Sequence, residues 1–217
     1  MKKRVAVSAL VVALAIAMLF SGCSMFAKRP DPAQGLEVVM SALMTRDKSE
    51  LEAFYPGVDL SDLNLDEIYG EEIDELVNDP SLGFTLTEEQ STRMKELLYT
   101  VFERVEYSAE TKAQDNKQAT VLLKLKSVDL AGVFGEVPED AVTEVTKRAL
   151  EQGVSLTDES ALTALAVDMM LEHWETAVSE AELTGEAEAE IQMQWTDGFW
   201  MPDEDALVAV VTEAFGN

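Results

Sequence analysis

The sequence has very few of the residues from which most metal centres and nucleophilic sites are built. Its 217 residues include one cysteine, Cys23, and one histidine, His173. A disulfide needs two cysteines, and a conventional zinc site draws three or four ligands mainly from Cys and His. We therefore expect no internal disulfide, no zinc site and no Cys–His nucleophilic pair.

Positive charge is also scarce. The chain has 16 Lys and Arg residues against 42 Asp and Glu residues, a formal net charge of −26. Binding to nucleic acid is driven by Lys and Arg neutralising phosphates, so this composition excludes a nucleic-acid partner. The apolar content of 47% nevertheless predicts a folded chain rather than a disordered one.

Long apolar runs are limited to one, residues 5–20, which follows the basic residues Lys2, Lys3 and Arg4. The run is shorter than the roughly 20 apolar residues that span a bilayer, and a basic segment before it is typical of a secretory signal. Ser21 and Gly22 then precede the single cysteine.

The residues Phe20-Ser21-Gly22-Cys23 resemble the lipobox of bacterial lipoproteins, although Phe20 stands where Leu is usual. The resemblance implies a diacylglyceryl thioether on Cys23, palmitate-type acylation and cleavage between Gly22 and Cys23. Two acyl chains anchor a protein stably, so we expect membrane attachment on the extracytoplasmic face. The alternative is a plain signal peptide, or an uncleaved anchor, with an incidental cysteine.

Three segments follow from this interpretation: a signal peptide over 1–22, the lipidated cysteine and a tether over 23–33, and one domain over 34–217. The mature chain would carry 13 basic and 42 acidic residues, a net charge of −29. That charge would repel anionic headgroups and hold the domain away from the membrane surface.

The first half of the domain shows helical periodicity and then alternation. Apolar spacing predicts a helix over 34–45, and start signals at 47–50, 64–67 and 87–90 predict three more. Of these signals, Thr87-Glu88-Glu89-Gln90 is the clearest capping box, whereas 47–50 would use Asp47 as the cap and Glu50 at the third position. Alternation over 105–113 and 118–129, around turn residues 115–117, predicts a hairpin with one buried face.

The second half contains a helical insert and a second hairpin. Pro138-Glu139-Asp140 predicts the first turn of a helix that ends at Gly153, and Thr157-Asp158-Glu159 predicts the cap of another. Alternation over 182–195 predicts the strongest strand, with small Gly185, Ala187 and Ala189 allowing close approach of a helix. A turn at 196–198, a short strand over 199–201 and a last helix from Pro202 complete the pattern.

The segment 191–202, a strand, a glycine-containing turn and a Trp in the final strand, resembles the C-terminal hairpin of nuclear-transport-factor-2-like (cystatin-like) domains. Residues 38–47 resemble the first helix of that family. The resemblance implies an α+β fold in which N-terminal helices pack on a curved, cone-like antiparallel sheet, with a helical insert between the hairpin and the C-terminal strands. It transfers no catalytic residue, because no motif of the enzymatic members is present.

Other polar groups have simple structural interpretations. His173 lies in a predicted helix, where a surface or packing role is expected rather than a catalytic one. Glu186, Glu188 and Glu190 could gather a hard cation, but calcium takes 6–8 oxygen ligands and no calcium-loop signature is present. We expect a solvated strand face, with Lys124 and Lys126 opposite the acids. Similarly, Asp203-Glu204-Asp205 is expected to open a helix.

A pocket between sheet and helices, if present, would be lined by aromatic and sulfur side chains. The candidate lining residues are Trp174, Trp195 and Met169. Core packing remains the default expectation for these side chains, and Trp195 is expected to be buried on the inward face of its strand.

The sequence thus predicts a lipid-anchored extracytoplasmic domain that binds a ligand or another envelope protein. The membrane is one partner, through Cys23, and no cofactor or metal is implied. We expect no enzymatic activity, because the inward-facing strand positions are almost all apolar. Two alternatives stay open: a small-pocket enzyme of the same fold, and a structural or stress-related envelope lipoprotein.

Overall fold

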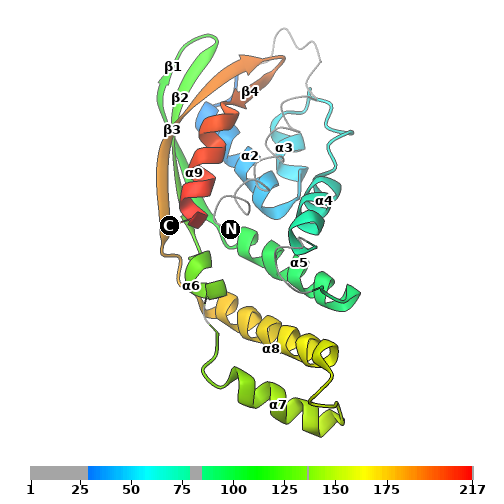
Figure 1. Ribbon diagram of the computed structural model, residues 1–217. Helices are drawn as coiled ribbons and strands as arrows, with labels where there is room; N and C mark the ends of the chain where they lie inside the picture. Colours follow the sequence, from blue (N-terminus) through cyan, green and yellow to red (C-terminus); the bar gives the residue numbers. More distant parts are fainter. Residues whose placement is uncertain (1–28, 79–84, 136, 217) are drawn as a thin grey trace.

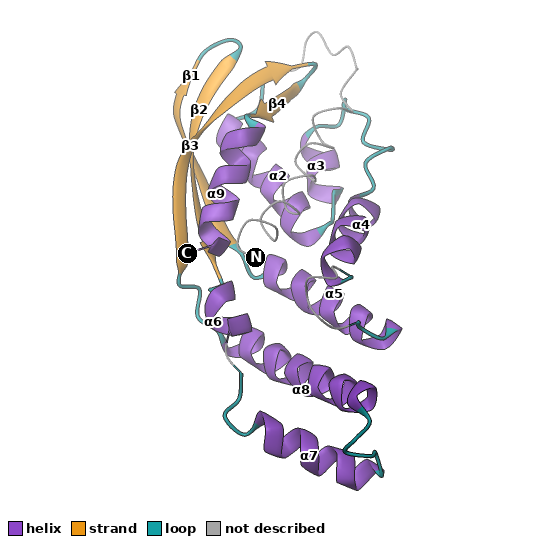
Figure 2. Ribbon diagram, viewed as in Figure 1, coloured by secondary structure: helices purple, strands orange, loops and turns teal. Residues whose placement is uncertain are grey.

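The computed structural model describes residues 29–78, 85–135 and 137–216, which form an α+β fold (Figures 1 and 2). The elements before the insert are α2 (Pro32–Thr45), α3 (Ser49–Phe54), α4 (Leu65–Val77), α5 (Glu88–Glu103), β1 (Glu106–Gln114) and β2 (Gln118–Ser127). The insert and C-terminal elements are α6 (Leu130–Gly135), α7 (Ala141–Gln152), α8 (Glu159–Glu180), β3 (Gly185–Thr196), β4 (Phe199–Pro202) and α9 (Glu204–Gly216).

The four strands form one open antiparallel sheet in the order β1-β2-β3-β4. On the β2–β3 pair, Lys124 lies opposite Glu188 and Lys126 opposite Glu186. Their charged groups approach to 3.7 and 3.2 Å respectively. The predicted pairing is therefore confirmed, and these lysines and glutamates share the solvated face of the sheet.

The other face of the sheet forms one side of the main hydrophobic core. Leu123 and Ile191 are fully buried in that core. Helices α2 and α9 pack on this side of the sheet (Figure 2). The small residues at the start of β3 allow α9 to pack closely, as predicted. The alternating burial of β3 also agrees with the prediction, although the strand begins at Gly185 rather than at 182.

A second, smaller apolar cluster lies where α5, α6 and α8 meet. Its buried members are Leu97, Val101, Val128, Val133 and Val178. Trp174 packs against this cluster, with its ring edge-to-face on Phe134 at a centroid distance of 5.4 Å. This cluster attaches the inserted helices to the body of the domain.

Most helix start and stop signals are confirmed. The Thr87 hydroxyl accepts from Gln90 N, and the Gln90 side chain accepts from Thr87 N, which completes the capping box of α5. Asp158 caps α8 by accepting from Ala161 N at 3.1 Å. Gly153 ends α7 in the left-handed conformation, with φ +71°, which favours glycine.

Two predicted starts are wrong. Asp47 does not cap α3: its carboxylate accepts from the backbone and hydroxyl of Ser49, and Lys48 is the residue before the helix. Such a local side-chain turn competes with a helix cap for the same acceptor. Similarly, Pro138 belongs to a turn in which its carbonyl accepts from Ala141 N, and α7 begins at Ala141.

The expected burial of Trp195 is met only in part. Trp195 is partly buried, whereas its cross-strand neighbour Trp200 is completely buried. The two rings meet edge-to-face at 5.2 Å. Strand alternation predicts the face of the sheet on which a side chain lies, but not its exposure. Trp195 lies near the end of β3, where fewer elements cover it.

Residues 29–31, the first that the structure describes, contact this same end of the sheet. Trp200 Nε1 donates to the Pro30 carbonyl at 2.8 Å, and the Arg29 guanidinium lies 5.5 Å from the Trp195 ring centroid. Asp31 caps α2, and its carboxylate also accepts from the Thr111 hydroxyl at 2.7 Å. Residues 29–33, assigned to the tether by the sequence, therefore contact the domain.

Candidate functional site

Helices α7 and α8 form a helical arm, residues 141–180, at the end of the molecule farthest from β4 (Figure 1). The arm leaves the sheet after β2 and returns at the start of β3. Its outer helix, α7, packs mainly on α8, and α8 in turn packs on α5. The arm thus depends on two helix–helix interfaces, an inner one between α5 and α8 and an outer one between α7 and α8.

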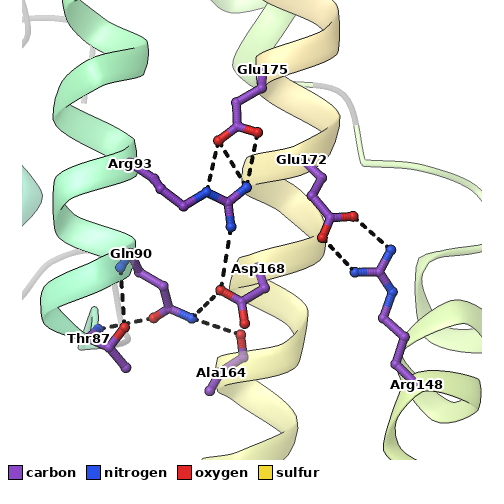
Figure 3. Close-up of polar contacts among 8 residues, drawn as sticks. All are labelled: Thr87, Gln90, Arg93, Arg148, Ala164, Asp168, Glu172 and Glu175. Atoms are coloured by element: carbon purple, nitrogen blue, oxygen red, sulfur yellow. Dashed lines mark hydrogen bonds and ion pairs between the residues drawn. The ribbon is translucent and has the colours of Figure 1, made fainter. Parts of the chain in front are cut away.

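The α5–α8 interface is held by a buried amide. Gln90, only 3% exposed, donates to the Ala164 carbonyl at 2.9 Å and to Asp168 Oδ1 at 2.8 Å (Figure 3). Its carbonyl oxygen meanwhile accepts from Thr87 N at 3.0 Å. One side chain therefore completes the N-terminal cap of α5 and fixes the position of α8 beside it.

A second contact across this interface is an ion pair with paired hydrogen bonds. Arg93 Nε and Nη2 donate to the two carboxylate oxygens of Glu175 at 2.9 and 3.0 Å (Figure 3). Nη1 lies 3.8 Å from Asp168 Oδ1. The planar guanidinium matches both oxygens of one carboxylate, so the contact sets the angle and register of the helices as well as their separation.

The α7–α8 interface repeats the arrangement on the outer side. Arg148 Nη1 and Nη2 donate to the two oxygens of Glu172 at 2.9 and 2.8 Å, and its Nε donates to Glu144 at 3.0 Å. The hydrogen bonds from Arg148 hold the pKa values of both Glu172 and Glu144 below their usual range. The same carboxylates raise the pKa of Arg148, so the cluster stays charged at neutral pH.

The outer side of α7 exposes apolar side chains to water. Among the described residues, the large apolar side chains that are most exposed all lie between 137 and 156: Val137 (67%), Val142 (81%), Leu150 (65%) and Leu156 (49%). Within α7 itself, Ala149 alone is fully buried. Few of the apolar side chains of α7 are therefore buried against α8.

The arm and the N-terminal attachment lie at opposite ends of the sheet. Arg29 and Pro30 contact Trp195 and Trp200 near the turn between β3 and β4, whereas the arm joins the sheet beside Gly185. β3 runs between these points over 12 residues, a rise of about 36 Å. Figure 1 shows β4 and α7 at the two ends of the molecule.

The structure separates the residues that the sequence offered as pocket lining. Trp195 belongs to the main core and Trp174 to the smaller cluster, and Met169 is buried on α8. A common pocket lined by all three is therefore not formed. His173, on α8, is half-buried, in keeping with the packing role expected of it.

The acidic residues of β3 are placed as expected. Glu186, Glu188 and Glu190 are exposed on the outer face of the sheet, and the first two pair with Lys126 and Lys124. A shallow depression of about 600 Å³ crosses this face beside the same residues. Within the described residues, no group of three or more acidic, His or Cys side chains is arranged to hold a metal ion.

Three buried polar side chains have hydrogen-bond partners within the fold. Ser127 donates to the Ala214 carbonyl at 2.5 Å, Gln90 joins α5 to α8, and the Tyr69 hydroxyl donates to the Leu43 carbonyl. Burial raises the pKa of Tyr69 above its ordinary value, so it remains a neutral donor. Each of these groups bonds within the fold rather than converging with the others on a space for a substrate.

Gly22 and Cys23, the predicted cleavage and lipidation site, lie outside the described residues. No helix within the described part of the chain is long and apolar enough to cross a membrane. The acids at 203–205 behave as expected at the start of α9, where Asp203 accepts from Ala206 N at 2.9 Å.

The interhelical contacts are the part of the site that sequence reasoning missed. Asp168, Glu172 and Glu175 recur at helical spacing on α8, and this was the available signal. Their arginine partners, Arg93 and Arg148, lie 82 residues before Glu175 and 24 before Glu172. Pairs this distant in sequence become evident once the helices are placed side by side.

No protein-family model and no curated protein matches this chain. Among solved structures, it is similar to the crystal structure of ycdA from Bacillus subtilis subsp. subtilis str. 168, a protein assigned as a lipoprotein. The identity is 18% and the TM-score 0.55, with 85% of this chain and 55% of that chain covered. The chain thus spans about half the length of that protein, and the likeness establishes a shared fold.

Proposed function

We propose that this protein is a lipid-anchored extracytoplasmic domain that binds another protein of the cell envelope. The observation that carries the proposal is Cys23, placed directly after Ser21-Gly22 at the end of the single long apolar run. The structural similarity to a protein assigned as a lipoprotein supports the same interpretation.

The anchor would bring one end of the domain close to the membrane. Arg29, the first described residue, is the sixth residue after Cys23, and six residue-to-residue steps of extended chain span at most about 21 Å. Because Arg29 and Pro30 contact Trp195 and Trp200, the end of the sheet near β4 would face the bilayer. The helical arm would then extend away from the membrane, toward partners in the surrounding space.

A binding role is favoured over catalysis by how the polar groups are used. Catalytic sites need polar groups that converge on a substrate. In the described residues, buried Gln90 and Ser127 instead bond to α8 and α9. The α7 side of the arm meanwhile exposes several apolar side chains, a feature typical of interaction surfaces.

We also propose that the body of the domain has the nuclear-transport-factor-2-like architecture. Its support is the open antiparallel sheet with helices on one face, preceded by α2, α3 and α4 and ended by the β3–β4 hairpin. The helical arm would be an addition to that architecture, inserted between the two hairpins.

The anchor is tested by labelling cells that express the full-length protein with alkyne-tagged palmitate. Wild-type protein should carry the label, remain with membranes and begin at Cys23 by mass spectrometry. Cys23→Ala should take up no label and remain uncleaved between Gly22 and Cys23. A Cys23→Ala protein that is still cleaved there and remains on membranes would show that the lipobox interpretation is wrong.

The side of the membrane is tested by adding protease to intact spheroplasts. We expect the domain to be digested there, whereas a cytoplasmic marker protein should survive until the cells are lysed. Protection of the domain to the same degree as the marker would contradict an extracytoplasmic location.

A further inference from the structure

We propose that the outer side of α7 is a docking surface for a positively charged amphipathic helix of another protein. The proposal rests on the proposed function and adds to it the place of binding and the chemistry of the partner. We define the α7 surface as Val137, Val142, Leu150 and Leu156 with the acidic residues beside them.

The apolar part of the surface follows one side of the helix. Val142 and Leu150 are eight residues apart, which places them about 12 Å apart along the axis and within about 80° around it. Both are more than 60% exposed. α7 spans 12 residues, about 18 Å, so a partner helix of about three turns would match its length.

The negative charge of the α7 surface favours a positively charged partner. Residues 137–159 contain six acidic and two basic residues. Both basic residues are already paired: Lys147 with Glu144 at 3.5 Å, and Arg148 with Glu144 and Glu172.

The other five acids are exposed and have no ion-pair partner among the described residues. Asp158 caps α8, and the remaining four are Glu139, Asp140, Glu151 and Glu159. An interface gains specificity when its rim charges meet charges of opposite sign. The complementary surface therefore has apolar residues at helical spacing, flanked by Lys and Arg.

The same charges disfavour the two other occupants. A second copy of this chain would bring the acids of one α7 against those of the other. A bilayer would present anionic headgroups, and the arm is also held about 36 Å along β3 from Arg29 and Pro30, the end joined to the predicted anchor. A basic protein segment outside the membrane satisfies both the charge and the position.

Side-chain contacts within the domain hold the arm in a defined position before any partner binds. Arg148 fixes α7 to α8, while Arg93 and Gln90 fix α8 to α5. A surface that is already ordered loses less conformational entropy on binding. These contacts give the weakly buried α7 a defined position despite its few apolar contacts.

The test uses photo-crosslinking from the full-length protein in the cells that naturally make it. The photoreactive residue benzoylphenylalanine replaces Val142 or Leu150, and replaces Glu188 on the outer sheet face as the control. After illumination, crosslinked peptides are identified by mass spectrometry. We expect Val142 and Leu150 to capture one segment that has more Lys and Arg than Asp and Glu and apolar residues at helical spacing.

The charge requirement is tested in the same assay. E139Q/E151Q should lower the crosslinking yield at position 142 roughly fivefold, since each exposed ion pair contributes up to about 1 kcal/mol. The matched control, E188Q, removes an exposed acid from the sheet face and should leave the yield at position 142 unchanged. Thermal melts of each variant confirm that the fold is retained.

The proposal is overturned by adducts to lipid, to a second copy of this chain, or to an acidic or neutral segment. An unchanged yield in E139Q/E151Q, or no adduct from either α7 position, also overturns it. Protein adducts from position 188 without any from α7 would leave the proposed binding function standing and reject this surface. Loss of the palmitate label, by contrast, would reject the anchor whatever the crosslinks show.

Discussion

Gly185, the first residue of β3, lies so close to Ala214 of α9 that a Cβ on Gly185 would stand 2.3 Å from the Ala214 carbonyl oxygen. The Ser127 hydroxyl, which would be 2.6 Å from the same Cβ, donates to that carbonyl. The sheet, its buried hydroxyl and α9 therefore meet at a point where no side chain fits.

This contact predicts that Gly185→Ala is strongly destabilising. The obstacle is backbone, which cannot swing aside as a flexible side chain would, so the cost should lie near the upper end of about 1–3 kcal/mol for overpacking. Urea unfolding followed by far-UV circular dichroism measures it. The matched control is Gly70→Ala in α4, where a Cβ meets nothing within 4 Å.

Gly70→Ala should stabilise the protein by about 0.5–1 kcal/mol, because alanine loses less backbone entropy than glycine on entering a helix. Equal unfolding midpoints for the two variants would contradict the close packing of α9 on β3.

A second prediction concerns the tryptophan pair. Trp200→Ala should cost about 3–5 kcal/mol, because Trp200 is fully buried and its ring nitrogen bonds to Pro30. Trp195→Ala should cost about 1–2 kcal/mol, because it removes a partly buried ring and its contacts with Trp200 and Arg29. Urea midpoints of both variants are compared with Glu188→Ala, expected within about 0.5 kcal/mol of the parent. A larger loss from Trp195→Ala than from Trp200→Ala would contradict the burial of this pair.

These two tryptophans show how far the sequence predicts the fold. The alternation of β2 and β3 was enough to pair Lys124 with Glu188, because a shift of one residue would bury a row of charges. The alternating pattern does not predict how deeply each inward-facing side chain is buried. It depends on what covers the strand, and residues 29–30 cover the pair from a part of the chain about 170 residues away.

The helical arm shows the same limit at the candidate site. Its helices were predicted from caps and glycines, since those signals are local. The exposure of Val142 and Leu150 was not predicted, because an apolar residue in a helix is normally expected to face a neighbour. In the fold, α7 has α8 on one side, and its other side is left exposed.

A third prediction concerns acid pH and α7. Hydrogen bonds from Arg148 lower the pKa values of Glu172 and Glu144 in the folded state. Their stabilising effect is therefore complete above the unfolded-state pKa of about 4.3, and it is lost as the pH falls through the lower folded-state values. Hydrogen exchange of α7 amides, corrected for intrinsic rates, should thus accelerate below about pH 4 relative to α2.

The variant that tests this mechanism is Arg148→Gln. At pH 7 its α7 amides should exchange faster than those of the wild type, and the difference should shrink as the pH falls through the lowered pKa values of Glu172 and Glu144. Lys147→Gln, which removes an exposed 3.5 Å pair with Glu144, is the control and should change little. A difference that persists undiminished at low pH would mean that Arg148 acts by packing rather than by charge.

The fourth prediction is that the hydrogen bonds of Gln90 stabilise the attachment of the arm to the body of the domain. Gln90→Leu keeps a side chain of similar size but removes the donor to Asp168 and Ala164 and the acceptor for Thr87 N. Loss of buried hydrogen bonds should cost about 1–3 kcal/mol, and the exchange of amides in α8 near Ala164 should accelerate at the same time.

Gln192 offers a matched control for this variant, since it is exposed on β3 and bonds to Thr120 at 3.1 Å. Gln192→Leu should stay within about 0.5 kcal/mol of the parent in urea melts and leave α8 exchange unchanged. Because leucine in place of Gln90 would add apolar burial beside α8, the competing outcome is a more stable protein. That result, together with unchanged α8 exchange, would mean that apolar packing rather than this amide fixes the arm, and that the polar contacts of α5 follow from the position of α8 instead of setting it.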